Sequence, residues 1–161
     1  MRSRTSEPRA QRSRSRAKSN ATQKKAKPDT SPVMSSGTAK ALGIKLLSVT
    51  RKKVVAEMPI KKLHMNRTDR VNGGAIMAFA DVLGAVGTVA NLPPGYRTTT
   101  LESKTNFFAA GMGPVLSGVS IPLHVGRTTN VWQTTVKNPD GRTVAIVTQT
   151  QIVLAPRKEQ D

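Results

Sequence analysis

The stretch from Gly73 to Leu92 reads GGAIMAFADVLGAVGTVANL and holds a single charged residue, Asp81. Seven of the residues before Val86 are alanine or glycine. A helix that is apolar all round lies either in a membrane or inside a protein. A central Asp costs about 2.5–3.5 kcal/mol in a membrane span, and the strands predicted on both sides would then have no helix to cover. We therefore interpret this stretch as a helix buried inside a sheet, whose small residues let the strands approach its backbone closely.

Strand-like sequence flanks this helix on both sides, because runs rich in Val, Ile and Thr are typical of strands. The predicted strands are residues 44–50, 53–60, 98–108, 115–125, 128–137 and 142–154. A short helical turn is expected at 38–42 and a polar loop at 63–70. Turn signals at 138–141 and 125–127 join the last three strands as antiparallel hairpins. The predicted fold class is therefore α+β, with a curved antiparallel sheet of five to six strands wrapped around one long central helix.

The N-terminal part of the chain has a different composition. Residues 1–32 contain ten basic and two acidic residues, and no Val, Ile, Leu, Phe, Tyr or Trp. Because such a segment can bury almost nothing, we expect a disordered basic tail over residues 1–35, a folded domain over 36–156 and a short C-terminal tail over 157–161. Met34 is a candidate biological start, and a chain beginning there is expected to keep its stability and activity.

Composition excludes several classes of site and raises the question of what the basic charge does. The 161 residues include no cysteine and only two histidines, with a formal net charge of +17. Disulfides, a thiolate nucleophile and a cysteine-ligated metal are excluded, and we expect no metal and no cofactor. No apolar stretch fits a secretory signal, so a cytoplasmic location is expected. The tail is open to three interpretations: a transit peptide, an arm that binds nucleic acid through its lysines and arginines, and a solvated segment without a partner. We favour the last, because no aromatic residue is interleaved to stack on bases.

Four residues around the start of the helix fall at a recognisable spacing. Asn66, Gly73, Gly74 and Asp81 match a pattern with Asn six residues before a His-Gly-Gly and Asp eight residues after its first Gly. This segment resembles the signature of hotdog-fold acyl-CoA thioesterases of the PaaI-like, phenylacetate-pathway type. The segments 105–111, 124–128 and 140–145 resemble later strands of that family, so the resemblance runs from about residue 40 to 155. It departs where Asn72 replaces the family's usual His and where Ala110 replaces a usual Pro.

The resemblance implies a hydrolase that splits a small, medium or aromatic acyl-CoA into the free acid and coenzyme A. The residues allow the same chemistry to be derived. The N–H groups of Gly73 and Gly74 start a helix, where they have no intrahelical partner and where the helix dipole adds positive potential, as an oxyanion site requires. Asp81 in an apolar helix is a candidate general base or nucleophile. The alternatives are plain close packing for the glycines, and for Asp81 a buried carboxylate satisfied by strand N–H groups or a lysine.

Spacing on the helix indicates an oligomer if both groups are catalytic. Gly73 and Asp81 are eight residues apart, which is about 12 Å along a helix, whereas reacting groups lie within about 3–3.5 Å. The carboxylate must then come from a second subunit. The resemblance implies the same, since hotdog thioesterases build their sites across a dimer interface and two dimers commonly pair into a tetramer.

Further residues are candidates for supporting roles in this site. Asn66 and Asn72 are assigned to the catalytic set as hydrogen-bonding groups, although a loop-structuring Asn66 is an equal alternative. Thr100 is expected to orient the water, or else simply to form a strand. Arg127, with Thr128, is expected to bind coenzyme A phosphates, or else to be a solvated turn residue. The remaining candidates are Phe107 and Phe108, of which one should face the acyl group and the other the sheet, and His64 and His124, which we interpret as structural.

Other classes of function remain open from the sequence. A non-catalytic hotdog module that binds acyl-CoA would keep the glycines but would not need Asp81. A nucleic-acid-binding protein would explain the charge, yet much of that charge lies in the tail. A hotdog dehydratase would rely on an active-site histidine that this helix region lacks. No membrane partner is expected, and acyl-CoA hydrolysis by a homodimer is the favoured function.

Overall fold

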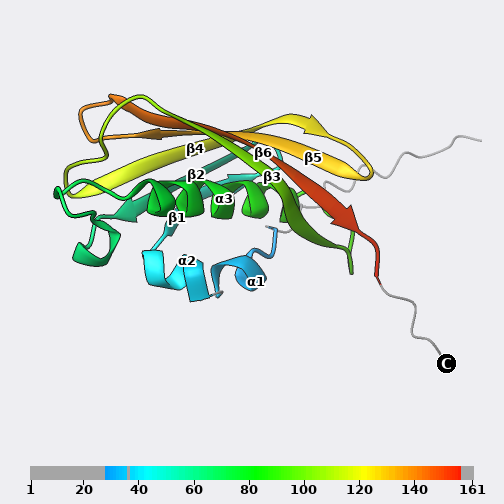
Figure 1. The fold of residues 1–161 in the computed structure, drawn as a ribbon. Coiled ribbons are helices and arrows are strands. Elements are labelled where there is room, and N and C mark those ends of the chain that lie inside the picture. The colour runs from blue at the N-terminus through cyan, green and yellow to red at the C-terminus, as the bar shows by residue number, and fades with distance from the viewer. Residues whose placement is uncertain (1–27, 36, 157–161) are drawn as a thin grey trace, which may run out of the picture.

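The computed structural model describes residues 28–35 and 37–156. Two short helices come first and a long helix lies among six strands (Figure 1). The elements are α1 (Ser31–Met34), α2 (Gly37–Leu42), β1 (Lys45–Thr50), β2 (Lys53–Pro59), η1 (Lys62–His64), α3 (Gly73–Val89), β3 (Arg97–Phe107), β4 (Val115–Val125), β5 (Thr129–Lys137) and β6 (Thr143–Leu154). The predicted strands are confirmed to within two residues at each end.

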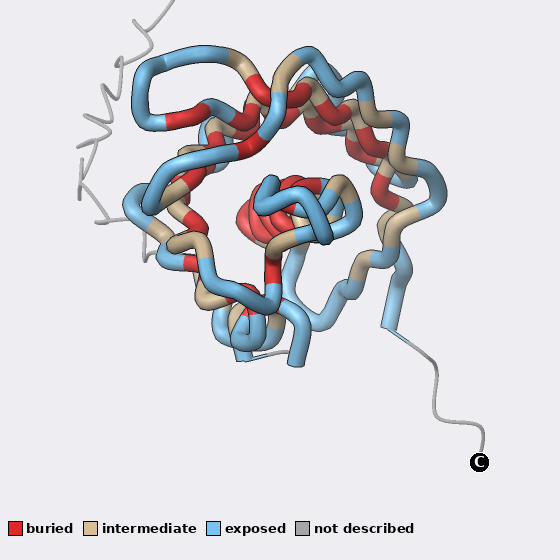
Figure 2. Tube along the Cα trace, turned by 60° about the vertical axis from the view of Figure 1, so that its left-hand side comes forward, coloured by how far each residue is buried: buried red, intermediate tan, exposed pale blue. Residues whose placement is uncertain are grey.

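The strands form one antiparallel sheet in the order β1-β2-β4-β5-β6-β3. Helix α3 lies against the concave side of this sheet, and the view along it shows strands curving around a buried helix (Figure 2). The helices α1 and α2 lie on the other side of α3 from the sheet (Figure 1). The predicted α+β hotdog arrangement is therefore confirmed.

The core forms where small residues of α3 admit large side chains from the sheet. Phe79, Leu83 and Val86 of α3 are fully buried. A Cβ atom on Gly87 would stand 2.6 Å from the Trp132 ring, so only glycine lets β5 approach the helix this closely. Burying one large apolar side chain contributes about 1.5–3 kcal/mol, and the small residues of the helix are what allow such burial.

The N-terminal boundary differs from the sequence prediction. Residues 31–34 form helix α1 inside the stretch assigned to the tail, and Val33 and Met34 pack, half-buried, against the core. Ala39 and Leu42 of α2 are buried in the same core. Because a chain beginning at Met34 would lose the contacts of Val33, that truncation is expected to lower stability rather than to be neutral. Residues 1–27 and 157–161 lie outside the described residues.

The long helix ends earlier than the apolar pattern indicates. The pattern predicts a helix to Leu92, but α3 ends at Val89, and Ala90 is its C-cap. The Asn91 side chain donates to the Gly87 carbonyl oxygen at 2.8 Å and to the Arg51 carbonyl oxygen at 3.0 Å. The first bond satisfies a terminal carbonyl group of the helix, and the second joins the end of the helix to the β1–β2 turn. None of the helices in the described part of the chain has the length and hydropathy needed to span a membrane.

Candidate active site

Asp81 lies in the middle of α3, half-buried, where the helix faces β3 and β6. Its carboxylate oxygen Oδ1 accepts a hydrogen bond from the Thr100 hydroxyl of β3 at 2.7 Å. The Gln149 side-chain amide of β6 donates to the same oxygen and to the Asp81 carbonyl oxygen, both at 3.2 Å. Two side chains from neighbouring strands therefore hold one oxygen of the only charged residue in the helix.

A second layer of hydrogen bonds fixes the direction of the Thr100 hydroxyl. Gln151 donates its Nε2 to Thr100 Oγ1 at 2.7 Å. The single hydroxyl proton of Thr98 is shared between two acceptors, Gln151 Oε1 at 3.0 Å and the Ile152 carbonyl oxygen at 2.8 Å. Because Thr100 accepts from an amide, its own single proton points to Asp81. A connected polar network of this kind holds its members in one arrangement.

The other carboxylate oxygen of Asp81 has a different environment. Among residues 28–35 and 37–156, no donor is bonded to Oδ2. The alternative in which strand N–H groups or a lysine satisfy the carboxylate is therefore not what the structure shows. The partners of Asp81 are the side chains of Thr100 and Gln149, and both bond to Oδ1. A carboxylate with one oxygen held and the other free can accept a proton or attack a carbonyl carbon.

The start of α3 offers one free N–H rather than the two that the sequence predicts. Asn72 is the N-cap residue, and its Oδ1 accepts from the Gly74 N–H at 2.7 Å. The Gly73 N–H has no acceptor among the described residues, and the Phe107 ring lies close, 3.1 Å from where a Cβ on Gly73 would stand. Asn72 therefore caps the helix, and Gly73 is the donor left for a ligand.

Asn66 shapes the loop before the helix. Its Oδ1 accepts from the Thr68 N–H at 2.9 Å, the Thr68 hydroxyl at 2.8 Å and the Arg70 N–H at 3.1 Å. The loop turns at Asp69, whose φ is +52°. Asn66 is exposed, and with its oxygen already used three times only its amide group remains for a substrate. The loop-structuring interpretation accounts for all three of these side-chain bonds.

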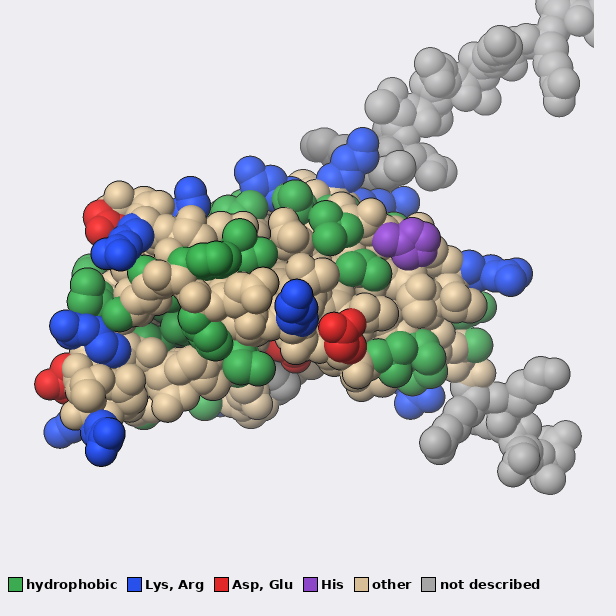
Figure 3. Space-filling model, turned by 45° about the horizontal axis from the view of Figure 1, so that its top comes forward, with side chains coloured by type: hydrophobic (Ala, Val, Ile, Leu, Met, Phe, Trp, Pro, Cys, Tyr) green, Lys and Arg blue, Asp and Glu red, His purple; other side chains and the backbone are tan. Residues whose placement is uncertain are grey.

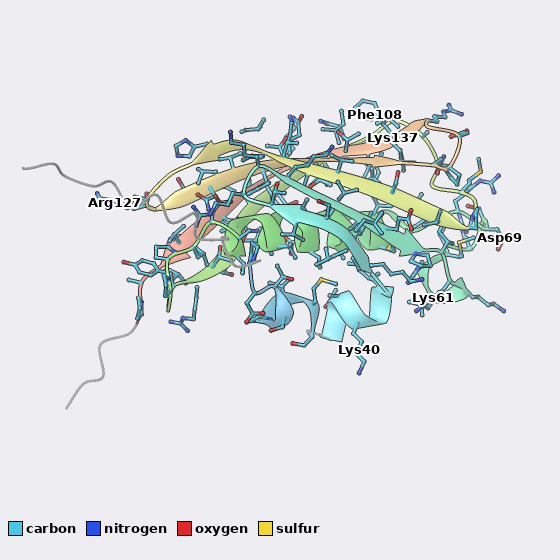
Figure 4. All side chains as sticks on the ribbon, turned by 180° about the vertical axis from the view of Figure 1, so that it is seen from behind. Lys40, Lys61, Asp69, Phe108, Arg127 and Lys137 are labelled. Carbon is cyan, nitrogen blue, oxygen red and sulfur yellow. The ribbon has the colours of Figure 1, made fainter. Side chains whose placement is uncertain are left out.

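The remaining predicted residues do not gather around Asp81 within one chain. Arg127 and Asp69 lie at opposite ends of the molecule, so Arg127 and the adjacent Thr128 are far from the start of α3 (Figure 4). Phe107 and Phe108 are 50% and 59% exposed, and Phe108 lies on the outer side of the sheet (Figure 4). Neither phenylalanine belongs to the core.

Gly73 and Asp81 are also held apart by the helix itself. Helix α3 is continuous from Gly73 to Val89, so the separation of about 12 Å along its axis stands. One chain therefore cannot bring the free Gly73 N–H and the free Asp81 oxygen to the same reacting carbonyl.

A cavity of about 1040 Å³ opens at the other end of α3. Its walls come from α1, the β1–β2 turn, the end of α3 and the loop before β3. Apolar side chains such as Val49, Val89 and Leu92 line it together with Thr98. Thr98 also belongs to the network around Asp81, and Thr98 and Thr100 are about 7 Å apart along the strand. The cavity therefore reaches β3 two residues from Thr100, the strand residue that holds Asp81.

The two histidines occupy different environments. His64 is buried, and its Nδ1 accepts from the Lys61 N–H at 3.2 Å. Burial lowers the pKa of His64, and the nearby charge of Lys61 lowers it further. His124 is exposed on β4. No group of three or more His, Cys, Asp or Glu side chains in the described ranges is placed to hold a metal ion.

Sequence reasoning missed Gln149, Gln151 and Thr98. Gln149 and Gln151 lie two residues apart on β6 and are both fully buried. The alternation of strand residues places 149 and 151 on one face, and a buried amide needs a polar partner. Two glutamines on the apolar face of a strand were thus the signal that could have pointed to a polar site beneath the sheet.

Comparison with known proteins gives a consistent result. A family model of the thioesterase superfamily matches residues 69–145. A protein of Vibrio cholerae named as an esterase is 29% identical over 119 residues, covering 74% of this chain and 79% of the relative. The 1,4-dihydroxy-2-naphthoyl-CoA hydrolase of Listeria monocytogenes is 21% identical over 122 residues, covering 76% of this chain and 99% of the relative.

Solved structures agree on the fold. A hypothetical thioesterase of Streptococcus pneumoniae, solved with coenzyme A, superposes with a TM-score of 0.67 at 24% identity and covers 75% of this chain and 94% of its own. The segment that the family model matches includes Gly73, the whole of α3 and β3 with Thr100, but it ends at residue 145 near the start of β6, so Gln149 lies outside it. The PaaI-like subtype stays a prediction. With its six-stranded sheet and its central helix the chain has the hotdog fold of these structures, and its residues 69–145 match the thioesterase superfamily.

Proposed function

We propose that this protein hydrolyses an acyl-CoA thioester to a free acid and coenzyme A, with Asp81 as the reacting carboxylate. The observation that carries the proposal is the asymmetry of Asp81: Oδ1 accepts from Thr100 and Gln149, while Oδ2 is without a donor in the described part of the chain. Because Oδ1 is held by two side chains, Oδ2 is the oxygen available to react.

Two routes use the free oxygen. As a general base, Oδ2 takes a proton from water while the hydroxide adds to the thioester carbon, and the coenzyme A thiolate leaves and takes up a proton. As a nucleophile, Oδ2 attacks the carbonyl carbon directly, expels the thiolate and forms an anhydride that water then hydrolyses. In both routes the carbonyl oxygen gains negative charge, and the Gly73 N–H is the group proposed to stabilise it.

The site is proposed to be shared between two subunits. The separation of Gly73 and Asp81 supports this, since the two groups act on one carbonyl only if they come from different chains. Strand β3 is an edge of the sheet with eleven residues, and Leu101 on it is 59% exposed. A long edge strand with exposed apolar residues favours pairing with a second copy.

A dimer of dimers is proposed from the outer face of the sheet. Ile121, Leu123 and Val125 of β4 are 43%, 55% and 47% exposed. Hydrophobic side chains gather on this outer face between scattered lysines and arginines (Figure 3). An exposed apolar surface of this kind is typical of an interface between protein molecules.

The acyl group is proposed to enter the cavity that begins at Thr98. Its volume of about 1040 Å³ and its valine and leucine lining suit a medium-length or aromatic acyl group. The relative that acts on a naphthoyl-CoA and the structural neighbour solved with coenzyme A support the substrate class. Arg127 and Thr128 are proposed to contact the phosphates of coenzyme A, and no cofactor beyond the substrate is required.

Thiol release from a panel of acetyl, medium-chain, long-chain and aromatic acyl-CoA esters tests this function. We expect turnover with at least one medium-chain or aromatic ester. The absence of thiol release with every ester, together with calorimetric binding of acyl-CoA, would instead support the non-catalytic binding module. A cytoplasmic location stays a prediction.

A further inference from the structure

We infer that Gln149 is a positioning residue that fixes the reactive orientation of Asp81, and that its presence in the core costs the protein stability. The inference rests on the proposed function, because it concerns how the reacting carboxylate is held. The new element is the role of Gln149, a residue of β6 that lies 68 positions along the chain from Asp81.

Gln149 is locked by its surroundings. The side chain is fully buried, and it lies across α3 one turn beyond Asp81, at Gly84. A Cβ on Gly84 would overlap the Gln149 amide group, with its Oε1 only 2.8 Å away. Glycine at position 84 therefore opens the space that the amide fills, and dense packing leaves the side chain no second rotamer of similar energy.

The chemistry of the two partners fixes which end of the amide faces Asp81. An ionised carboxylate only accepts hydrogen bonds, so the Nε2 group faces Oδ1 and the Oε1 atom faces away. That Oε1 is buried and has no hydrogen-bond partner in the described part of the chain. A buried acceptor without a partner is destabilising, and a hydrocarbon side chain of similar volume would avoid this cost.

The bond pattern explains why such a cost is tolerated. The Nε2 group donates to both the carbonyl oxygen and the carboxylate of Asp81, at 3.2 Å each. Together with Thr100, it holds Oδ1 and so turns Oδ2 outward from the network. A functional site that sacrifices stability to hold a reacting group is a common compromise in enzymes. Gln149 thus contributes to the rate through Asp81 and does not touch the substrate.

The principal test is Gln149→Leu, with Gln133→Leu as matched control. Gln133 lies on the neighbouring strand β5, its amide contacts Thr148 at 3.5 Å, and its register partner is Thr148 rather than Gln149. We expect Gln149→Leu to lower kcat by about 10- to 100-fold, to leave KM within about twofold because substrate contacts are unchanged, and to keep or raise Tm. Gln133→Leu should leave kcat, KM and Tm near wild type.

A second variant keeps the volume of the side chain. Gln149→Glu places a second carboxyl beside Asp81, and two close carboxylates cannot both ionise freely. At low pH the introduced carboxyl holds a proton and can donate it to Oδ1. The loss of kcat relative to wild type should therefore shrink as the pH falls from about 8 to about 5. A loss of kcat that does not shrink at low pH would mean that a restored donor at position 149 does not recover the rate, which contradicts the positioning role.

The outcomes separate this inference from the proposed function. If the wild-type protein releases no thiol from any ester, the proposed thioesterase function is refuted. If the wild type is active and Gln149→Leu keeps kcat within about twofold, only the positioning role of Gln149 is refuted. If Gln149→Leu loses several degrees of Tm together with all activity, the stability cost of Gln149 is refuted. Gln149→Glu then decides the positioning role, which a pH-independent loss of kcat overturns.

Discussion

The start and the middle of helix α3 are held by different kinds of contact. At the start, Asn72 caps Gly74 two residues away, and Asn66 bonds to groups two and four residues away. In the middle, Asp81 is held by Thr100 and Gln149, which are 19 and 68 residues away. The start of the helix is thus built by its own segment, while the middle is built by the sheet.

This difference assigns the two regions different roles. At the start of the helix the side chains of Asn66 and Asn72 bond to groups of their own segment. The group left for a ligand is therefore the backbone N–H of Gly73, and any helix N-terminus can offer such an N–H. A carboxylate held by two strands is positioned only when the whole domain is folded. Removing a side chain from the middle should therefore change the rate. At the start, blocking the Gly73 N–H should also change the rate, whereas removing the side chains that hold the loop and the cap should mostly change stability.

Asp81→Asn is the strongest test of this contrast. Asn lacks the negative charge needed to accept a proton or attack a carbonyl, so kcat should fall by about 100-fold or more. The variant should keep its Tm within a few degrees, because Asn can still accept from Thr100. Thiol release and thermal melting measure the two effects.

Asp69→Asn is the control for removing a carboxylate. Asp69 is exposed and has a positive φ, which Asn tolerates as well as Asp. The Asp69→Asn variant should therefore retain the wild-type kcat. Near-wild-type kcat in Asp81→Asn would contradict the catalytic assignment.

A mixing experiment tests whether the two regions meet across a dimer. Gly73→Val blocks the N–H of one region, because its Cβ would approach the Phe107 ring, and Asp81→Asn disables the other. With a shared site, each mixed dimer has one intact site and one site with both lesions. Half of the randomly paired dimers are mixed, so subunit exchange should restore up to about a quarter of wild-type activity. Proven exchange, for example by mass spectrometry of differently tagged chains, without recovered activity would refute the shared site.

The cavity at the end of α3 should control which acyl chain lengths are accepted. Val89→Phe narrows it at the end of α3, so kcat/KM for medium and long acyl-CoA esters should fall by about 10-fold, with acetyl-CoA unaffected. Leu47→Phe introduces the same ring at an exposed position of β1 outside the cavity lining and should change kcat/KM for none of the esters. An equal loss for all chain lengths would place the acyl group elsewhere.

The cap at the start of α3 should matter for stability. Asn72→Ala removes the acceptor of the Gly74 N–H and should lower the free energy of unfolding by about 0.5–2 kcal/mol, measured by urea denaturation. Asn72→Asp keeps an acceptor at the same place and should retain most of that free energy. Loss of kcat in Asn72→Asp without loss of stability would indicate a direct catalytic role for Asn72.

The smallest effects are expected from truncation. A chain lacking residues 1–27 should keep its Tm within about 1 °C if that segment makes no contact with the domain. A chain beginning at Met34 also loses Val33, which is half-buried against the core, and its Tm should fall by up to about 4 °C. Equal Tm values for the two truncated chains would mean that Val33 contributes nothing measurable. Lost binding of nucleic acid on truncation would assign a function to the basic tail.

The sequence by itself determined the elements and their class. The apolar run with one Asp predicted α3, and alternating Val, Ile and Thr predicted the strands, because both patterns depend on neighbours within a few residues. The spacing of Gly73 and Asp81 also sufficed to predict that one chain cannot complete the site, since the rise of a helix is fixed. Two boundaries were misplaced: the end of α3, where the Asn91 side chain bonds to the Gly87 carbonyl oxygen, and the N-terminal boundary of the domain, where α1 lies inside the stretch assigned to the tail.

The tertiary structure alone decided what holds Asp81. Thr100 was a candidate from its place in a strand, but Gln149 and Gln151 carry no local signal that assigns them to a particular helix residue. Their partners depend on the register of β6 against β3 and on which face of α3 the sheet covers. The same holds for Val33, whose burial depends on α1 folding back under α3. Such contacts between distant segments follow from the packing of the whole domain, which no short stretch of sequence encodes.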